Sequence, residues 1–371
     1  MKQSKGNTDK VQAIVKALIP WYLKNARDLP WRREPHCKDP YCVYVSEIML
    51  QQTQVKTVIP YWERWMRELP TVASLAKAKP EKIHKLWEGL GYYTRVRNMQ
   101  KAAQQIVSCK FPETFDEVLA LPGIGRYTAG AICSIAFNQS IPILDGNVIR
   151  VLTRVFGIKE NPREKNANAR LWDLAERLVV HAAGLAAPKR SEGGCSHFNQ
   201  SLMELGALVC TPRDPKCDAC PVSKHSFAFQ HQRVSEFPNL DKRPIVTVRR
   251  FAAFVVESSG KFLVRQRPAG VVNAHLWEFP NAELNGSPVN PSATMKELFG
   301  FTPKYVKSLC TIKHSITRYR MTVEAFYAKA PNRLQREPQT KWLPISELHK
   351  LSFPSAHKRI LQSLQTTRFE P

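Results

Sequence analysis

The stretch Leu121-Pro-Gly-Ile-Gly-Arg-Tyr-Thr-Ala-Gly130 lies between two helical patterns and indicates how the surrounding chain folds. Gly123 and Gly125 allow a tight turn and leave backbone N–H groups uncovered by side chains. A helix of small residues begins directly afterwards, so these donors and the positive end of that helix can meet one phosphate. The stretch therefore predicts two helices joined by a turn that binds an anion.

Two glycines alone would favour an ordinary turn between helices. The complete LPGIG run before a small-residue helix is more specific, and it favours a helix–hairpin–helix motif that contacts the DNA backbone without reading its sequence. The 371-residue chain carries 55 Lys and Arg against 31 Asp and Glu, a formal net charge of +24 spread along the chain. Such a charge favours a polyanionic partner, and we expect double-stranded DNA.

Other features limit the class of protein. An acidic membrane would suit the same charge, but the chain has no run of about 18 apolar residues and no basic amphipathic segment. The polar start, MKQSKGNTDK, lacks the apolar core of a secretory signal. We therefore expect a cytoplasmic, nucleoid-associated monomer, in which the nine cysteines are thiols or metal ligands rather than disulfides.

Outward from the hairpin, the chain divides into two domains. Residues 8–225 show helical spacing of apolar residues interrupted by prolines, and residues 226–244 show no sustained period, which predicts a linker. Residues 245–371 are rich in β-branched and aromatic runs. TVRRFAAFVVES (247–258) and KFLVRQRP (261–268) predict a hairpin, the run 311–330 one or two strands, and 354–365 a short helix. The fold class is therefore multi-domain, all-α and then α+β.

Two carboxylates stand out by their context. Glu47 is the lone charge in the mostly apolar YVSEIMLQQTQV, where loss of water raises the pKa of a carboxyl and suits it to carry a proton. Asp145 follows Ile-Leu and precedes a Gly-Asn turn, so spacing fits an N-cap and a catalytic residue equally well. Cleavage of an N-glycosidic bond needs one acid for the leaving base and one carboxylate for the cationic sugar.

Several strings together resemble the MutY-type adenine DNA glycosylases of the helix–hairpin–helix glycosylase superfamily. The strings are LPW at 29–31, SEIMLQQTQV at 46–55, VIPYWERW at 58–65, WEGLGYY at 87–93, LPGIGRYTAG at 121–130, ILDGNV at 143–148 and FNQSLMELGALVC at 198–210. The resemblance implies removal of adenine opposite 8-oxoguanine or guanine by base flipping. It makes Glu47 the proton donor and Asp145 the stabiliser of the sugar cation, with Tyr127 and Asn147 beside them.

The same resemblance implies the DNA contacts. Gln200 is expected to contact the extruded base, while Gln52 and Tyr92 fill the space that the base leaves in the stack. Without the resemblance, core packing would be the simpler interpretation of Tyr92. Related lyases carry a lysine where this chain has Tyr127. A phenol cannot form the imine with the sugar, so we expect base removal without strand cleavage.

A cysteine motif departs from the family's pattern. Cys210, Cys217 and Cys220 keep the C-x6-C-x2-C spacing that in the family precedes a fourth cysteine and completes a [4Fe–4S] site, but Ser226 occupies the fourth position. The alternatives are an oxygen ligand from Ser226 or water, a distant cysteine such as Cys195, a zinc site that includes His225, or no cluster. In each case the loop presents basic residues to phosphates, namely Arg213, Lys216 and Lys224.

The second domain resembles the Nudix-like C-terminal domain of these enzymes, which recognises 8-oxoguanine. The segment 285–300 lacks the glutamate-rich helix that holds magnesium in Nudix hydrolases, so pyrophosphate hydrolysis is not expected. Where the family has a Phe-Ser-His loop, this chain has Ile316-Thr317-Arg318, in which Thr317 keeps a hydroxyl. The alternatives are a glycosylase for another mismatched base and a non-catalytic lesion-binding protein. FNQ and the second domain disfavour the first, and Glu47 with Asp145 disfavours the second.

Overall fold

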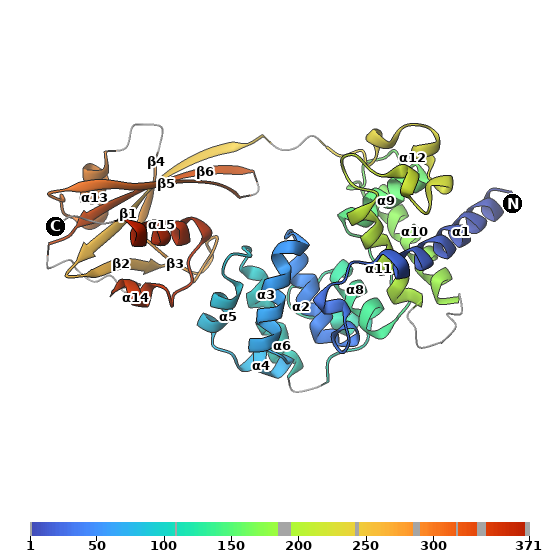
Figure 1. The fold of residues 1–371 in the computed structure, drawn as a ribbon, viewed down its shortest axis with the longest axis horizontal. Helices are drawn as coiled ribbons and strands as arrows, with labels where there is room; N and C mark the ends of the chain where they lie inside the picture. The colour runs from blue at the N-terminus through green and yellow to red at the C-terminus, as the bar shows by residue number, and fades with distance from the viewer. Residues whose placement is uncertain are drawn as a thin grey trace. The chain divides into compact units, whose positions relative to one another are not determined.

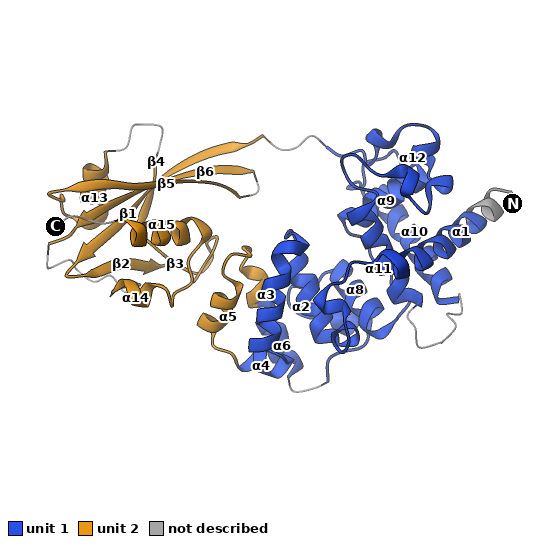
Figure 2. Cartoon of the chain, viewed as in Figure 1, with its two compact units in different colours: residues 1–77, 98–242 blue, residues 78–97, 243–371 orange. Residues whose placement is uncertain are grey.

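The computed structural model describes residues 2–107, 110–184, 194–241, 245–284, 290–316, 318–331 and 339–367. The chain forms two compact units, shown in Figure 2. Unit 1 comprises residues 1–77 and 98–242, and unit 2 comprises residues 78–97 and 243–371. Among the described helices, none has both the length and the apolar character needed to cross a membrane.

Unit 1 is helical (Figure 1). Its elements are α1 (Lys2–Asn25), α2 (Pro40–Leu50), α3 (Val55–Glu68), α4 (Val72–Lys77), most of α6 (Thr94–Ile106), α7 (Phe115–Leu119), α8 (Arg126–Phe137), α9 (Gly146–Phe156), α10 (Lys165–Gly184), α11 (Gly194–Leu208) and α12 (Phe227–Gln230). Apolar faces of α1, α9, α10 and α11 pack into one core that includes Leu18, Val151, Leu178 and Phe198. Burial of these stripes stabilises helices that would be marginal alone.

The hairpin predicted at 121–130 joins α7 to α8. Gly123 has a φ of 78°, and a Cβ there would lie 2.6 Å from Nδ2 of Asn98, so the turn requires glycine. Gly125 is the N-cap of α8 and provides no side-chain cap, and a Cβ there would meet no atom within 4 Å. The N-terminus of α8 is therefore open to an incoming anion.

Unit 2 is built on a mixed β-sheet. Its described strands are β1 (Thr247–Ser258), β2 (Lys261–Gln266), β3 (Trp277–Glu278), β4 (Asn281–Leu284), β5 (Val306–Ile316), β6 (Tyr319–Lys329) and β7 (Thr340–Leu343). The order is β3-β2-β1-β6-β5, with β4 on β1 and β7 on β2. β1 and β6 run parallel at the centre, and β1–β2 is the antiparallel hairpin that the sequence predicted. The run predicted as one or two strands lies in β5 and β6, which also pair antiparallel.

Helices cover both faces of this sheet. α14 (Ile345–Leu348) and α15 (Ser355–Thr366) contribute Leu348 and Ile360 to one apolar cluster, and α13 (Pro291–Phe299) contributes Met295 to the other. Successive residues of β1 alternate between the clusters: Val255 packs in the first and Phe254 in the second. A strand buried on both faces explains why this run is apolar rather than alternating. In α13 the one acidic residue, Glu297, is exposed.

The linker begins later than the sequence predicted, and one segment of the predicted first domain groups with unit 2. The expected linker at 226–244 is wrong over its first part, because residues 227–237 form α12 and a 3-10 turn in unit 1. Phe237 is buried, and its carbonyl accepts a bond of 3.1 Å from Nε of Arg154. Residues 78–97, including α5 (Pro80–Trp87), group with unit 2 instead of with the rest of 8–225.

Candidate active site

One cavity of about 1090 Å³ in unit 1 collects the four predicted catalytic residues and two of the predicted DNA-contact residues. Its lining includes Glu47 from α2, Tyr127 from α8, Gln200 from α11 and both Asp145 and Asn147 at the start of α9. It also includes the exposed Gln52, which follows α2 with a left-handed φ of 55°. Residues more than 150 positions apart in the chain thus meet in one space, which we call the active-site cavity.

Glu47 lies near the end of α2, a helix that begins with Asp39 as N-cap and Pro40 in its first turn. Its side chain is 7% exposed. Burial raises the pKa of this carboxyl to about 7, although a hydrogen bond from Tyr127 opposes the shift. The carboxyl is thus partly protonated at neutral pH, as expected for a proton donor.

Tyr127 occupies the first turn of α8, just after the glycine hairpin. Its hydroxyl donates to Oε2 of Glu47 at 2.8 Å and lies 3.3 Å from Sδ of Met203. Burial and the nearby charge of Glu47 raise the pKa of this phenol well above its ordinary value. Tyr127 therefore remains a neutral donor that orients Glu47.

Asp145 is the N-cap of α9, as one interpretation of its sequence context predicted, and it also lines the active-site cavity; its catalytic role stays a prediction. Its carboxylate accepts from the backbone N–H of Val148 at 2.7 Å and from Nδ2 of Asn147 at 3.0 Å. Burial raises its pKa, while these two bonds act in the opposite direction. Asn147 is itself held by Arg150, whose Nη2 donates to Oδ1 of Asn147 at 2.8 Å.

Sequence reasoning missed a buried ion cluster on the same cavity. Glu204 in α11 accepts from the backbone N–H, Nε and Nη2 of Arg27 and from Nη2 of Arg32, at 2.8–2.9 Å. The signal was present, since Glu204 is a lone carboxylate in the apolar SLMELGALV, just as Glu47 is in its own stretch. Nearby, Gln200 accepts from the hydroxyl of Tyr22 at 2.8 Å, which fixes the orientation of its amide.

Tyr92, another predicted DNA-contact residue, is not part of the lining of this cavity. Tyr92 belongs to unit 2, where it has a φ of 46° and is 45% exposed, whereas the neighbouring Tyr93 is buried. Core packing therefore describes Tyr93 and not Tyr92. Thr317 lies outside the described residues, between β5 and β6.

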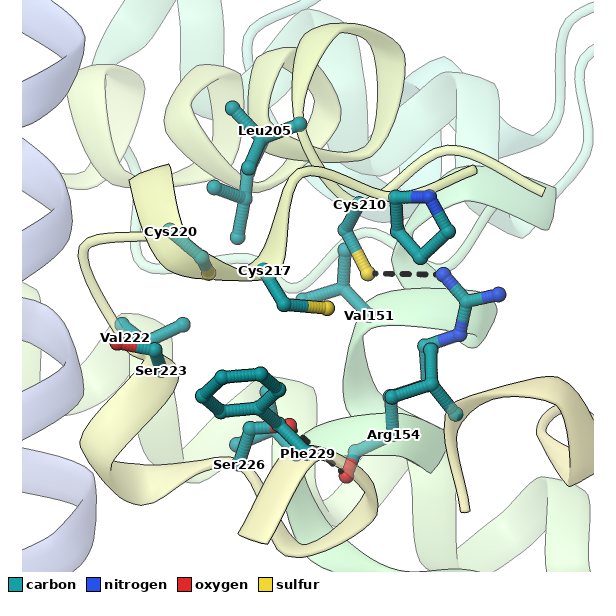
Figure 3. A pocket seen from close by; sticks show the side chains of 14 residues that line it. Val151, Arg154, Leu205, Cys210, Cys217, Cys220, Val222, Ser223, Ser226 and Phe229 are labelled. Atoms are coloured by element: carbon teal, nitrogen blue, oxygen red, sulfur yellow. Dashed lines mark hydrogen bonds between the residues drawn. The ribbon is translucent and has the colours of Figure 1, made fainter. Parts of the chain in front are cut away.

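The three cysteines of the C-x6-C-x2-C motif line one small pocket (Figure 3). Ser226 lies at its edge and donates to the carbonyl of Arg154 at 3.4 Å, and the ring of Phe229 also faces the pocket. The described lining includes neither His225 nor Cys195, whose thiol is buried in α11 against Val179. The structure thus brings neither alternative ligand to the pocket.

A [4Fe–4S] cluster does not fit these residues as they are folded. Ser226, at the position of the fourth ligand, has its hydroxyl bonded to the carbonyl of Arg154. Three thiols and a serine also fall short of the four thiolates that such a cluster uses. No group of three His, Cys, Asp or Glu among the described residues has the arrangement of a metal site.

Side chains from α9 hold the segment instead. We call residues 210–226 the cysteine loop. Arg154 donates to Sγ of Cys210 at 3.4 Å and to the carbonyl of Thr211 at 2.8 Å, and Arg150 donates to the carbonyl of Cys210 at 2.7 Å. The three basic residues predicted to face phosphates are all exposed, namely Arg213, Lys216 and Lys224.

Comparisons with known proteins identify both parts of the chain. Residues 45–177 match the HhH-GPD superfamily of base excision DNA repair proteins, and residues 252–363 match the NUDIX domain. A thermostable thymine-DNA glycosylase of known structure superposes with a TM-score of 0.52 at 28% identity, covering 60% of this chain and 98% of that one. These matches confirm the predicted helix–hairpin–helix and Nudix-like folds.

Curated relatives extend the match to nearly the whole chain. The adenine DNA glycosylase of Rattus norvegicus is 34% identical, covering 96% of this chain and 79% of the relative. That of Buchnera aphidicola from Schizaphis graminum is 32% identical, covering 93% of this chain and 96% of the relative. The chain therefore belongs to the adenine DNA glycosylases, hydrolases of N-glycosidic bonds in base excision repair.

Proposed function

We propose that this chain acts as a monomer on double-stranded DNA and removes adenine paired with 8-oxoguanine or, more slowly, with guanine. The adenine is extruded into the active-site cavity, where Glu47 protonates it and Asp145 stabilises the sugar cation. The observation that carries the proposal is the buried, hydrogen-bonded Glu47 carboxyl, with a pKa of about 7, in a cavity large enough for a nucleotide.

Glu47 makes adenine a better leaving group. A neutral carboxyl donates its proton to a ring nitrogen as the bond from the base to C1′ breaks. The resulting Glu47 anion remains stabilised by the hydroxyl of Tyr127. Water then adds to C1′ and gives up a proton that restores neutral Glu47, so the products are free adenine and an abasic site in an unbroken strand.

Asp145 acts on the other fragment. As the base leaves, C1′ and the ring oxygen acquire positive charge, which a fixed carboxylate offsets. The bonds from Val148 and Asn147 favour the ionised form of Asp145 and hold it in one orientation. Gln200, with its amide oriented by Tyr22, is proposed to contact the extruded base.

Tyr127 supports a reaction without strand cleavage. In related lyases a lysine at this position attacks the sugar, whereas a phenol cannot form the imine. The pKa of this phenol is raised well above its ordinary value, so it stays neutral. We therefore infer a monofunctional glycosylase.

DNA is proposed to be held at several points. The open N-terminus of α8 behind Gly123 and Gly125 binds a backbone phosphate, and Gln52 and Tyr92 occupy the space that the adenine leaves. Unit 2 is proposed to recognise 8-oxoguanine near Thr317. The cysteine loop contributes phosphate contacts from its exposed basic residues, and no step passes through a [4Fe–4S] cluster because the residues do not fit one.

Single-turnover cleavage tests the proposal, on duplexes with one adenine opposite 8-oxoguanine, guanine or cytosine, with and without alkali. We expect strand breaks only after alkali, fastest opposite 8-oxoguanine, and dependent on Glu47. Breaks without alkali would contradict the role of Tyr127. Lesion binding with no release of adenine would contradict the enzyme itself.

A further inference from the structure

A buried carboxylate in unit 2 has no role in the proposed chemistry. Glu88 directly follows α5 and is 5% exposed. Its carboxylate accepts from Nζ of Lys85 at 3.0 Å, from Nζ of Lys358 at 2.9 Å and from the backbone N–H of Phe353 at 2.9 Å. Burial alone would raise the pKa of Glu88, but these donors lower it overall, so the group is ionised.

The bonds of Glu88 join two distant parts of the chain. Lys358 belongs to α15 and Phe353 to the segment before it, both in the Nudix-like fold, whereas Glu88 lies in the range that matches the HhH-GPD family. Two further hydrogen bonds join the same two parts of the chain. Lys85 donates to the carbonyl of Leu351 at 2.9 Å, and Arg97 donates to that of Ala274 at 3.2 Å.

Glu88 is the first residue of a turn, residues 88–93, which we call the Tyr92 turn. The residues on either side of this turn donate hydrogen bonds to its carbonyls. Nε1 of Trp87 donates to the carbonyl of Gly91 at 3.0 Å, and Arg95 donates to the carbonyls of Leu90 and Gly91. The guanidinium of Arg95 also lies over the rings of Trp87 and Tyr92. A displacement of Glu88 is therefore transmitted to Tyr92 through the bonds that Trp87 and Arg95 make to the turn.

We propose that Glu88 is a positioning residue, which fastens the Tyr92 turn to the Nudix-like fold so that Tyr92 enters the DNA stack from a fixed place. The inference rests on the proposed function, since it concerns the step in which adenine leaves the stack. It ties adenine extrusion to the domain proposed to recognise 8-oxoguanine. Loss of Glu88 should slow extrusion and spare the chemical step.

The experiment compares Glu88→Ala, Lys358→Ala and the double variant in the full-length protein. Glu347→Ala is the matched control, because Glu347 forms an exposed pair with Lys350 in the same unit. Single-turnover rates are measured on two substrates. In the first, adenine lies opposite 8-oxoguanine in a fully paired duplex; in the second, the same two bases lie in the middle of a three-nucleotide bubble of unpaired bases. In the bubble, leaving the stack costs less. Emission from 2-aminopurine beside the adenine reports unstacking.

We expect Glu88→Ala to slow duplex cleavage roughly tenfold or more, to reduce the unstacking signal and to leave the bubble rate within about twofold. The double variant should be no slower than Glu88→Ala, because the two groups act together. Equal rates for Glu88→Ala and Glu347→Ala would overturn the inference. So would equal slowing on duplex and bubble, which indicates damage to the active-site cavity.

Two outcomes separate this inference from the proposed function. A wild-type protein that releases no adenine from either substrate refutes the proposed function. A wild-type protein that does so, with Glu88→Ala unchanged, refutes the inference alone. If Glu88→Ala does not fold, Lys358→Met decides the matter. That variant keeps the bonds of Glu88 to Lys85 and Phe353. It should also slow cleavage of the duplex more than cleavage of the bubble, but by a smaller factor than Glu88→Ala.

Discussion

Glu47 and Glu204 are both buried carboxyls on the wall of one cavity, yet their charge states differ. Glu47 is 7% exposed, receives one neutral donor, and has a pKa that burial raises to about 7. Glu204 is 0% exposed, and although burial alone would raise its pKa, bonds from Arg27 and Arg32 lower it to about 2. Burial therefore sets the penalty for charge, and the donors decide whether the charge remains.

The largest expected effect comes from removing the proton at Glu47. Glu47→Gln keeps the shape and an acceptor for Tyr127 but cannot donate a carboxyl proton, so adenine release should fall about 10³-fold or more. Single-turnover cleavage measures the rate, and binding to the A:8-oxoguanine duplex is the control. A loss of less than tenfold would remove Glu47 from the mechanism.

The same variant should be more stable than the wild type. The raised folded-state pKa of Glu47 means that folding opposes its ionisation, so the charged form costs stability at pH values above the unfolded-state pKa. Glu47→Gln removes that cost, and its Tm should exceed that of the wild type at pH 8 by more than at pH 5. Equal Tm values at pH 8 would contradict a desolvated carboxyl.

Glu204→Gln tests the opposite member of the pair. It leaves Arg27 and Arg32 without their anion at a buried position, which should cost about 3 kcal/mol of unfolding free energy. Denaturant unfolding measures this, with Asp28→Asn as the control because Asp28 pairs with Arg33 on the surface. An unfolding free energy equal to that of Asp28→Asn would contradict this prediction. It would mean that water satisfies the two arginines once the carboxylate is gone.

The pH dependence of the rate sharpens the comparison further. Glu47 acts only when protonated, so the single-turnover rate should be highest below pH 7 and fall as pH rises through about 7. Tyr127→Phe removes the donor that stabilises the anion, so the pKa should rise and the fall should move roughly one pH unit higher. A shift to lower pH would contradict the assigned direction of this hydrogen bond.

The smallest expected effect concerns the cysteine loop, which offers three thiols and a serine in place of four thiolates. Cys217→Ser should change the rate of adenine release and the Tm only slightly, and the purified wild-type protein should contain well under four iron ions per chain. Arg154→Met is the contrasting variant and should lower the Tm clearly, because Arg154 holds the loop carbonyls. Stoichiometric iron and sulfide, lost on Cys217→Ser, would reverse this assignment.

Most of the fold was accessible from the sequence, because it is encoded locally. The hairpin glycines, the β1–β2 turn and the end helix α15 are set by backbone conformation and short-range periodicity. The start of the linker and the grouping of residues 78–97 were missed for the opposite reason. Phe237 and Glu88 bind partners that lie 83 and 265 positions away in the chain, which no local pattern reveals.

The candidate site shows the same division. The lone charge of Glu47 in an apolar stretch pointed to a desolvated carboxyl, and the turn after Asp145 pointed to an N-cap, as observed. Residue type did not indicate that Tyr127 would lie 2.8 Å from Glu47, because they are 80 positions apart. Glu204 carried the same local signal as Glu47, but its arginine partners come from another part of the chain, and their bonds are what keep that carboxylate ionised.

The hydrogen bonds from Arg154 to the cysteine loop have a consequence for how this enzyme is produced in the cell. A guanidinium that bonds loop carbonyls needs no assembly machinery and no metal delivery, since it is made with the chain. We expect such a protein to reach full abundance under iron starvation. Expression in iron-depleted medium, followed by a rate measurement on the unsupplemented protein, bears directly on that expectation.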